Sequence, residues 1–373
     1  MPRKLCDTPF FRRSIMKNGK TVVAVVGCGR ISEAAHFPAL SSMADVEIRY
    51  ACDLIPEKAQ AKVERFGAGR AITDYREALS DPEVDAVYVL TPNYAHYTVS
   101  VDAMRAGKHV FCEKPITVSF DLAKKMSEEA SNTGRLLAIG VCNRYHRSVE
   151  ELHDLVAEGR FGKIYTVYCS FRESRSIPGL GGPFTTRAES GGGVLIDWGI
   201  HFLDLILYVL GGAKILTVSA GAYSEMAKNI SDYRYTSMWA GPPVPDGTND
   251  VEDYVTGFVR TDKCSISFNG AWAENIDTPG QMFIDFMGDR AGAHLKYGGR
   301  YRIFDSSLTA YDSEGDIPNM YAKEDRDFID SVREFSEGSV RLTRGNIRYV
   351  LESQRLLSAI YASAEAGREL SFV

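Results

Sequence analysis

Over the first 140 residues, short apolar runs alternate with stretches of helical periodicity. The apolar runs are residues 21–26, 46–52, 84–90, 109–112 and 136–141. Continuous runs of this kind are typical of strands buried on both faces of a parallel sheet. The helical stretches between them include residues 57–66, 95–105 and 119–133. This alternation predicts an α/β fold whose first part is a doubly wound parallel sheet of about six strands.

After about residue 146 the rhythm changes. Strand-like runs follow one another without regular crossover helices, which predicts a mostly antiparallel, open sheet in an α+β domain. These runs are residues 163–172, 215–223, 251–260, 265–272 and 282–287, and the helical stretches are 148–158, 324–337 and 345–366. We therefore expect an N-terminal arm (1–20), a dinucleotide-binding domain (21–145) and a second domain (146–373). The two closing helices either pack on the second sheet or return to the first domain.

Length and charge narrow the class of protein. A chain of 373 residues is long enough for about two domains. A net charge of −6 argues against a nucleic-acid or anionic membrane partner, since either needs a basic face. The seven cysteines show neither a CxxC pair nor zinc-like spacing, as expected of reduced thiols in a cytoplasmic protein. The basic first twenty residues lack the apolar core of a secretory signal.

A glycine-rich turn follows the first strand directly. In Gly27-Cys28-Gly29-Arg30-Ile31, the first glycine permits a tight turn and the second lets a pyrophosphate approach the backbone. The amides of Arg30 and Ile31 begin a helix and carry the positive end of its dipole. The third position of the dinucleotide fingerprint holds Ser32 in place of glycine, and its short side chain still allows close packing of the helix on the strand.

The acidic residue expected of a dinucleotide site is Asp53, which follows the second strand. It stands 26 positions after Gly27, somewhat beyond the usual spacing for the carboxylate that binds the adenosine ribose. Leu54, Ile55 and Pro56 follow it, so no adjacent cation is available for a 2′-phosphate. NAD is therefore favoured over NADP. In the alternative reading, Asp53 caps the helix that begins near Pro56.

Polar residues also follow the later strands of the first sheet. They are Thr91, Asn93, His96, Glu113, Lys114 and Asn143. The carboxyl ends of parallel strands meet at one edge of the sheet, where ligands of open α/β folds bind. We therefore expect all six to contribute to the cofactor site.

A second polar feature lies in an apolar helix. Residues 194–210 follow Gly191-Gly192-Gly193 and are apolar almost all round, apart from Asp197, His201 and Asp204. A 100° step places these three on one stripe, and buried charges need partners. The stripe therefore faces a polar site, although a structural network is the favoured reading for Asp204. A metal site is the remaining alternative, but Lys114 nearby would disfavour a divalent ion and no His or Cys cluster completes its ligands.

Two motifs together resemble the signatures of the Gfo/Idh/MocA family of nicotinamide-dependent oxidoreductases. The first is LTPNYAH followed by AGKHVFCEKP within residues 90–115, and the second is GGG-x3-D-x3-H-x2-D within residues 191–204. The resemblance extends from about Lys20 to the C-terminal helices. It implies a Rossmann domain followed by a substrate-binding and oligomerisation domain. It also implies that Lys114, Asp197 and His201 meet the substrate hydroxyl beside the nicotinamide.

The expected reaction is NAD-dependent oxidation of a secondary ring hydroxyl in a sugar or glycoside, with a 3-keto product preferred. His201 is the expected base, because histidine titrates near neutral pH. Asp197 orients it, and Lys114 stabilises the developing negative charge. Arginines and aromatic residues of the second domain suit a polyhydroxylated ring, although surface ion pairs are the alternative for the arginines. They are Arg172, Arg175, Arg187, Tyr233, Tyr235 and Trp239.

Three other functions fit the same residues. The enzyme could be an inositol or free-sugar dehydrogenase, or it could cleave glycosides through transient oxidation with tightly held NAD. A non-catalytic NAD and sugar sensor is the third, although Lys114, Asp197 and His201 together argue against it. By the same resemblance we expect a cytoplasmic homo-oligomer that assembles through the open face of the second sheet.

Overall fold

A computed structural model describes residues 19–235, 238–277, 280–305, 307, 310–313 and 319–372. The predicted arm, apart from Gly19 and Lys20, lies outside these residues. The chain forms two compact units. The first holds the chain up to Thr117, Asp121–Gly140 and Tyr321–Arg348; the second holds Val118–Phe120, Val141–Met320 and Tyr349–Val373.

The first unit contains a six-stranded sheet in which every pairing is parallel. Its strand order is β3-β2-β1-β4-β5-β6, the order of a doubly wound dinucleotide-binding fold, so the predicted fold is confirmed. The strands are β1 (Thr21–Val26), β2 (Val46–Cys52), β3 (Arg70–Ile72), β4 (Ala86–Val89), β5 (His109–Glu113) and β6 (Leu137–Gly140). The edge strand β3 escaped the sequence pattern because it has only three residues, of which one is buried.

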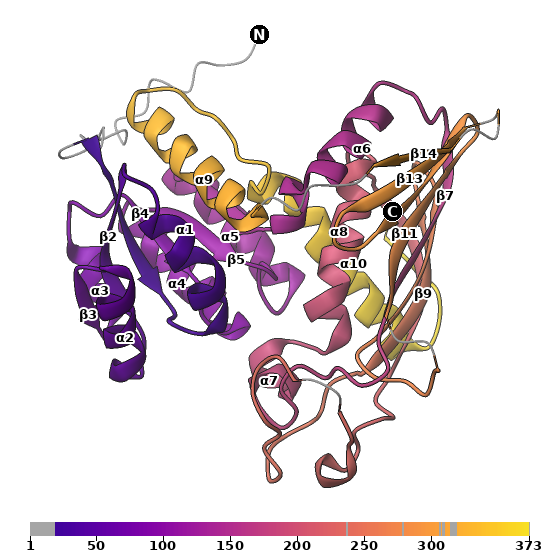
Figure 1. Cartoon of the computed structure of the whole chain (residues 1–373), viewed down its shortest axis with the longest axis horizontal. Helices are drawn as coiled ribbons and strands as arrows, with labels where there is room; N and C mark the ends of the chain where they lie inside the picture. The colour runs from indigo at the N-terminus through magenta and orange to yellow at the C-terminus, as the bar shows by residue number, and fades with distance from the viewer. Residues whose placement is uncertain are drawn as a thin grey trace. The chain divides into compact units, whose positions relative to one another are not determined.

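Helices complete the first unit (Figure 1). They are the π-helical η3 (Ser32–His36), α1 (Phe37–Ser41), α2 (Pro56–Phe66), α3 (Tyr75–Ser80), the 3-10 turn η4 (Asn93–Ala95), α4 (His96–Arg105), α5 (Phe120–Thr133) and α9 (Met320–Ser336). Helix α9 comes from the far end of the chain. Its Phe328, Ile329 and Val332 pack into the same core as Phe37 and Tyr88.

The predicted division into 21–145 and 146–373 therefore differs from the observed units. The apolar face of α9 completes the core of the first unit, so residues 321–348 belong there. The pattern of α9 predicted a packed helix, but periodicity alone does not indicate which sheet receives it. Of the two alternatives for α9, return to the first domain is confirmed.

The second unit contains a nine-stranded sheet of order β14-β13-β12-β11-β7-β10-β9-β8-β15. All neighbours are antiparallel except β7 and β10, so the mostly antiparallel prediction is confirmed. The strands are β7 (Ile164–Arg172), β8 (Ile215–Tyr223), β9 (Tyr254–Thr261), β10 (Ser265–Ala271), β11 (Gln281–Gly288), β12 (Ala291–Lys296), β13 (Arg300–Asp305), β14 (Ala310–Ser313) and β15 (Leu370–Ser371). The last four were missed, because β12 is rich in Gly and Ala, β13 alternates with arginine, and β14 and β15 are short.

Helices cover one face of this sheet (Figure 1). The helical elements are η5 (Cys142–Tyr145), α6 (Arg147–Ala157), η6 (Pro183–Thr185), α7 (Arg187–Ser190), the π-helical η7 (Leu195–Gly199), α8 (Ile200–Val209), η8 (Ile230–Asp232) and α10 (Ile347–Ala366). The helix over 187–209 is long and apolar enough to cross a membrane by composition, yet 78% of its apolar window is buried within the protein. Burial of this extent is typical of a core helix.

Candidate active site

At Gly27 the glycine-rich turn has a backbone conformation that only glycine adopts without strain. Its φ is +104°, and a Cβ at this position would lie 2.3 Å from the carbonyl oxygen of Leu90. Gly27 therefore lets the end of β1 approach the end of β4, where the strand order reverses. At Gly29 a Cβ would meet nothing within 4 Å, so this part of the turn presents its backbone to open space.

Ser32 and Asp53 hold this turn in place. Buried Ser32 donates its hydroxyl to the carbonyl of Gly29 at 2.7 Å, which is how the turn accommodates serine in place of the third glycine. Asp53 Oδ2 accepts the Cys28 amide at 2.8 Å, and Oδ1 accepts the Ile55 amide at 2.9 Å. Asp53 therefore shapes two loops and does not cap α2, whose N-cap residue is Ile55.

These residues fit a dinucleotide. Gly29 leaves the backbone open to a pyrophosphate, and Arg30 and Ile31 directly after it begin a helix, whose first amides carry the positive end of its dipole. Half-buried Asp53 has carboxylate lone pairs beyond the two amide contacts, which suits ribose hydroxyls. At the end of β4, the buried Oγ1 of Thr91 has no hydrogen-bond partner among the described residues, as expected of a group that awaits a ligand.

His96 and Glu113, two of the predicted cofactor residues, are occupied by the protein. His96 is 1% exposed, and its nitrogens lie 2.8 Å from the Pro115 carbonyl and 2.9 Å from the Thr91 carbonyl. Buried Glu113 faces His36 and also accepts the amide of Lys114 at 3.0 Å. The structure thus gives both side chains contacts inside the first unit, where the sequence predicted contacts to the cofactor. Asn93 and Lys114 are half-buried at the ends of the same two strands.

In the second unit, three glycines fix the start of the apolar helix. Gly191 has a φ of +85°, a Cβ on Gly192 would lie 2.0 Å from the Tyr361 hydroxyl, and one on Gly193 would lie 1.9 Å from the Glu252 carbonyl. The buried carboxylate of Glu252 accepts amides from Gly193 at 2.9 Å and from Leu195 at 3.1 Å. The helix that carries Asp197 therefore begins at a rigid point.

The predicted polar stripe divides into two parts. Asp197 and His201 are half-buried, whereas Asp204 is 2% exposed. The Asp204 carboxylate accepts hydrogen bonds from Nε and Nη2 of Arg144 at 2.8 and 2.6 Å, and from the hydroxyl of Ser353 at 2.6 Å. The structural reading of Asp204 is confirmed. The described residues contain no group of three or more His, Cys, Asp or Glu side chains that could hold a metal ion.

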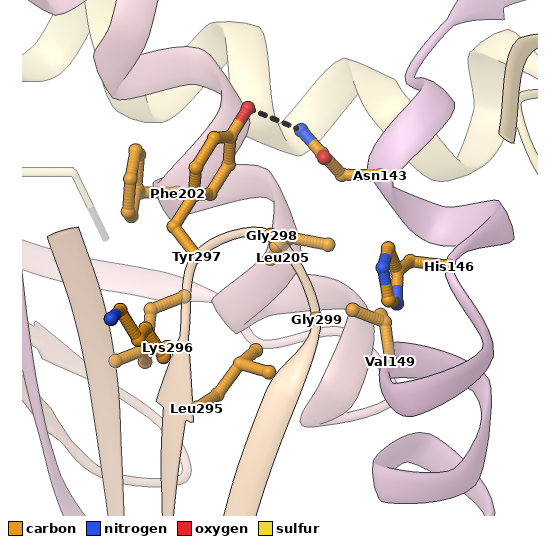
Figure 2. Close-up of a pocket in the computed structure, with 11 residues that line it drawn as sticks. Asn143, His146, Val149, Phe202, Leu205, Leu295, Lys296, Tyr297, Gly298 and Gly299 are labelled. Atoms are coloured by element: carbon orange, nitrogen blue, oxygen red, sulfur yellow. Dashed lines mark hydrogen bonds between the residues drawn. The ribbon is translucent and has the colours of Figure 1, made fainter. Parts of the chain in front are cut away.

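Asn143 lies beside His201. Its amide nitrogen is 2.9 Å from His201 Nδ1. The same nitrogen is 3.3 Å from the hydroxyl of Tyr297 (Figure 2). The sequence predicted Asn143 as a cofactor residue, whereas the structure brings it to the predicted base. Tyr297, in the turn between β12 and β13, was not predicted, because nothing in a Tyr-Gly-Gly turn indicates what the ring contacts. Burial raises the pKa of Tyr297, so its hydroxyl stays neutral.

A small pocket, with a cavity volume of about 10 Å³, is lined in part by Asn143 and Tyr297 (Figure 2). Its remaining lining is His146, Val149, Phe202, Leu205, Ile284, Leu295, Lys296, Gly298 and Gly299. The lining is mainly apolar and includes neither Asp197 nor His201. A ring rich in hydroxyls needs many polar partners, so this pocket is unsuited to be the whole substrate site.

The three predicted arginines are engaged in local contacts. Arg172 at the end of β7 contacts Glu274 at 2.7 Å and Gln281 at 3.0 Å. Arg175 contacts the carbonyl of Glu274, and Arg187 contacts that of Asp250. The ion pair raises the pKa of Arg172 against the opposing effect of burial. These contacts match the ion-pair alternative, and a substrate role for Arg172 stays a prediction.

The aromatic residues of the 224–250 segment differ in exposure. Tyr233 is buried, whereas Tyr235 and Trp239 are exposed, by 45% and 43% respectively. The Trp239 ring packs edge-on against Phe184, with centroids 5.9 Å apart. Tyr235 and Trp239 are therefore the two that can contact a ligand, and Tyr233 belongs to the core.

Comparison with known proteins agrees with this architecture. Residues 21–141 match the model of an oxidoreductase family with an NAD-binding Rossmann fold, and residues 149–294 match the GFO/IDH/MocA C-terminal domain. D-glucoside 3-dehydrogenase of Escherichia coli (strain K12) is 30% identical over 357 residues, 95% of this chain and 98% of that protein. A putative UDP-kanosamine synthase oxidoreductase subunit of Amycolatopsis mediterranei (strain S699) is 30% identical over 92% of this chain and 96% of its own.

The fold is shared with a solved structure. An oxidoreductase domain protein from Kribbella flavida superimposes with a TM-score of 0.81 at 19% identity, over 95% of this chain and 99% of that one. The fold and the glycine-rich turn define an NAD-dependent oxidoreductase. The chain belongs to the Gfo/Idh/MocA family.

Proposed function

We propose that this oxidoreductase oxidises a secondary ring hydroxyl of a sugar or glycoside, with a glycoside and a 3-keto product preferred. The observation that carries the proposal is the half-buried pair Asp197 and His201, with Nδ1 of His201 held by Asn143. The similarity to D-glucoside 3-dehydrogenase over nearly the whole chain favours a glycoside. Exposed Tyr235 and Trp239 offer aromatic faces to the C–H surface of a sugar or to an aglycone.

Proton transfer is assigned to His201. When bound, NAD supplies the hydride acceptor; the protein must remove the hydroxyl proton and align the substrate. Nε2 of His201 takes that proton, Asp197 fixes the neighbouring hydroxyls, and the Lys114 ammonium stabilises the developing negative charge on oxygen. General-base assistance of this kind contributes about 10²–10⁴-fold in rate.

Asn143 decides which nitrogen of His201 carries the proton. With the amide nitrogen toward Nδ1, as in this structure, Nδ1 accepts and the neutral ring holds its proton on Nε2, the form that donates to a ketone. With the amide rotated by 180°, its oxygen accepts from Nδ1–H, and Nε2 carries the lone pair that acts as a base. One asparagine can therefore support both directions of the reaction.

The direct test is a substrate panel with the purified protein. Methyl glycosides, free hexoses and inositols are each supplied with NAD or NADP, and the absorbance of released NADH is followed. We expect a kcat/KM at least about tenfold higher for a glycoside than for an inositol, and a preference for NAD, because no cation follows Asp53. Product analysis by NMR locates the new carbonyl.

Each alternative gives a different result in this panel. If an inositol or a free sugar is turned over best, that compound and not a glycoside is the substrate. Aglycone release without NADH indicates cleavage through transient oxidation, and binding without turnover of any substrate indicates a sensor. A carbonyl at a carbon other than C3 contradicts the 3-keto preference.

We also infer a cytoplasmic homo-oligomer. The six cysteines of the described residues form no disulfide and are buried, which suits a reducing compartment. On the sheet face opposite the helices, aromatic side chains include Tyr168, Phe283 and Phe304, and Phe304 is 45% exposed. A second copy that covers this face would bury them. Light scattering is expected to give a multiple of 41.3 kDa, and a Phe304→Asp substitution to shift it toward the monomer. A wild-type mass of one chain would contradict this inference.

A further inference from the structure

A buried histidine links three segments of the first unit. His36, in η3 just after the glycine-rich turn, is 0% exposed. Its Nδ1 lies 2.9 Å from Oδ1 of Asp325 in α9, and its Nε2 lies 3.1 Å from Oε1 of Glu113 at the end of β5. Both ring nitrogens therefore face carboxylates, which accept but do not donate when ionised.

The surroundings favour the charged form of this ring. Burial alone would lower the pKa of His36, but the carboxylates of Asp325 and Glu113 outweigh it and raise that pKa to about 10. The rings of Tyr88, Phe111 and Tyr321 surround the imidazole at centroid distances of 6.0, 5.2 and 5.9 Å. An imidazolium satisfies both carboxylates at once, which a neutral ring with one N–H cannot do.

Glu113 connects His36 to the backbone of Lys114. Its Oε2 accepts the amide of Lys114 at 3.0 Å. The carboxylate also fills the space beside Gly140, where a Cβ would lie 2.8 Å from Oε1. The amide of Lys114 is thus connected through Glu113 and His36 to a carboxylate on α9.

A second buried histidine holds the other side of Lys114. His96 Nδ1 lies 2.8 Å from the carbonyl of Pro115, and Nε2 lies 2.9 Å from that of Thr91. The ring lies between the segment after β5 and the segment after β4 and contacts both. Burial lowers the pKa of His96, and a neutral ring has one N–H, so it donates to one of these carbonyls and packs against the other.

We propose that His36 and His96 are positioning residues for Lys114, and that they hold its backbone from the two sides. The catalytic consequence rests on the proposed role of Lys114, but the positioning itself does not. When the backbone is fixed at Glu113 and Pro115, the Cα of Lys114 has one position, and its side chain extends toward the substrate from that position. A displacement of about 1 Å in such a group costs about 10²-fold in rate.

The test compares His36→Leu and His96→Leu with His109→Leu. His109 is a third buried histidine, at the opposite end of β5; it accepts the Leu136 amide at 3.1 Å and packs on Phe335. Hydrogen exchange is measured by mass spectrometry on peptides that cover residues 111–116. We expect the Lys114 amide to exchange at least about tenfold faster in the first two variants than in wild type, and at the wild-type rate in His109→Leu.

Kinetics gives the second measurement. The first two variants are expected to lose about 10- to 100-fold in kcat, with little change in KM for NAD. Unchanged exchange at Lys114 in both would overturn the proposal. His36→Leu leaves two buried carboxylates without their shared cation, which can prevent folding. The double variant His36→Leu/Asp325→Asn removes one of these charges and is used if the single variant does not fold. The Lys114 amide is expected to exchange at least about tenfold faster in it than in wild type, as in His36→Leu. Faster exchange with unaltered turnover would support the positioning and contradict the catalytic role of Lys114 instead.

Discussion

Lys114→Ala is expected to lower kcat by about 10²–10⁴-fold while NAD affinity stays within about twofold of wild type. The ammonium is proposed to stabilise the oxyanion that forms as the hydroxyl proton leaves, whereas the residues that fit the dinucleotide lie in the glycine-rich turn and at Asp53. His201→Ala is expected to lower kcat by a similar factor, because it removes the proton acceptor. Steady-state kinetics and NAD titration by fluorescence give the two quantities.

Lys124→Ala is the matched control, since Lys124 is an exposed lysine of α5 in the same unit. Its kcat is expected to equal that of wild type. Near wild-type turnover by Lys114→Ala or His201→Ala would refute the assignment of that residue. Loss of NAD affinity in parallel with kcat would point to a binding role instead.

Asp204→Ala is expected to lower the free energy of unfolding by about 3–5 kcal/mol. The change leaves the Arg144 guanidinium buried without its carboxylate, and it removes the acceptor of the Ser353 hydroxyl. Breaking one partner of a buried ion pair is more damaging than the net strength of the pair, because the remaining charge stays desolvated. Urea unfolding followed by circular dichroism measures the effect.

The control for this change is Glu369→Ala, which breaks an exposed pair with Arg260. Exposed pairs contribute about 0–1 kcal/mol, so only a small change is expected. Equal destabilisation by both variants would contradict the structural role of Asp204. A third comparison is Asp204→Asn, which keeps the hydrogen-bond acceptor and is expected to lose less than the alanine variant.

The sequence predicted best where a local pattern is sufficient. The parallel strands of the first sheet are apolar on both faces, so their runs mark them directly, and Gly27 follows from a turn that only glycine tolerates. Asp204 was assigned to a structural network because a carboxylate deep in an apolar helix needs a buried partner. The identity of that partner, Arg144, lies 60 positions away and could not be deduced from periodicity.

The sequence did not predict the contacts of residues whose partners come from distant segments. His96 and Glu113 were placed at the correct sheet edge, but being at an edge does not determine whether a side chain turns toward a ligand or into the protein. Asn143 was expected to serve the cofactor, and its contact with His201 was not foreseen. His36 gave no signal at all, because its carboxylates lie 77 and 289 positions away in the chain.

The return of α9 to the first unit has a consequence for synthesis. As the chain leaves the ribosome, the six parallel strands emerge early, yet Asp325 and the apolar face of α9 follow only after the strands through β14. Until then His36 lacks one of its two counter-ions, and the core around Tyr88 lacks Phe328. The nascent dinucleotide-binding unit therefore stays incomplete until residues 321–348 have been synthesised.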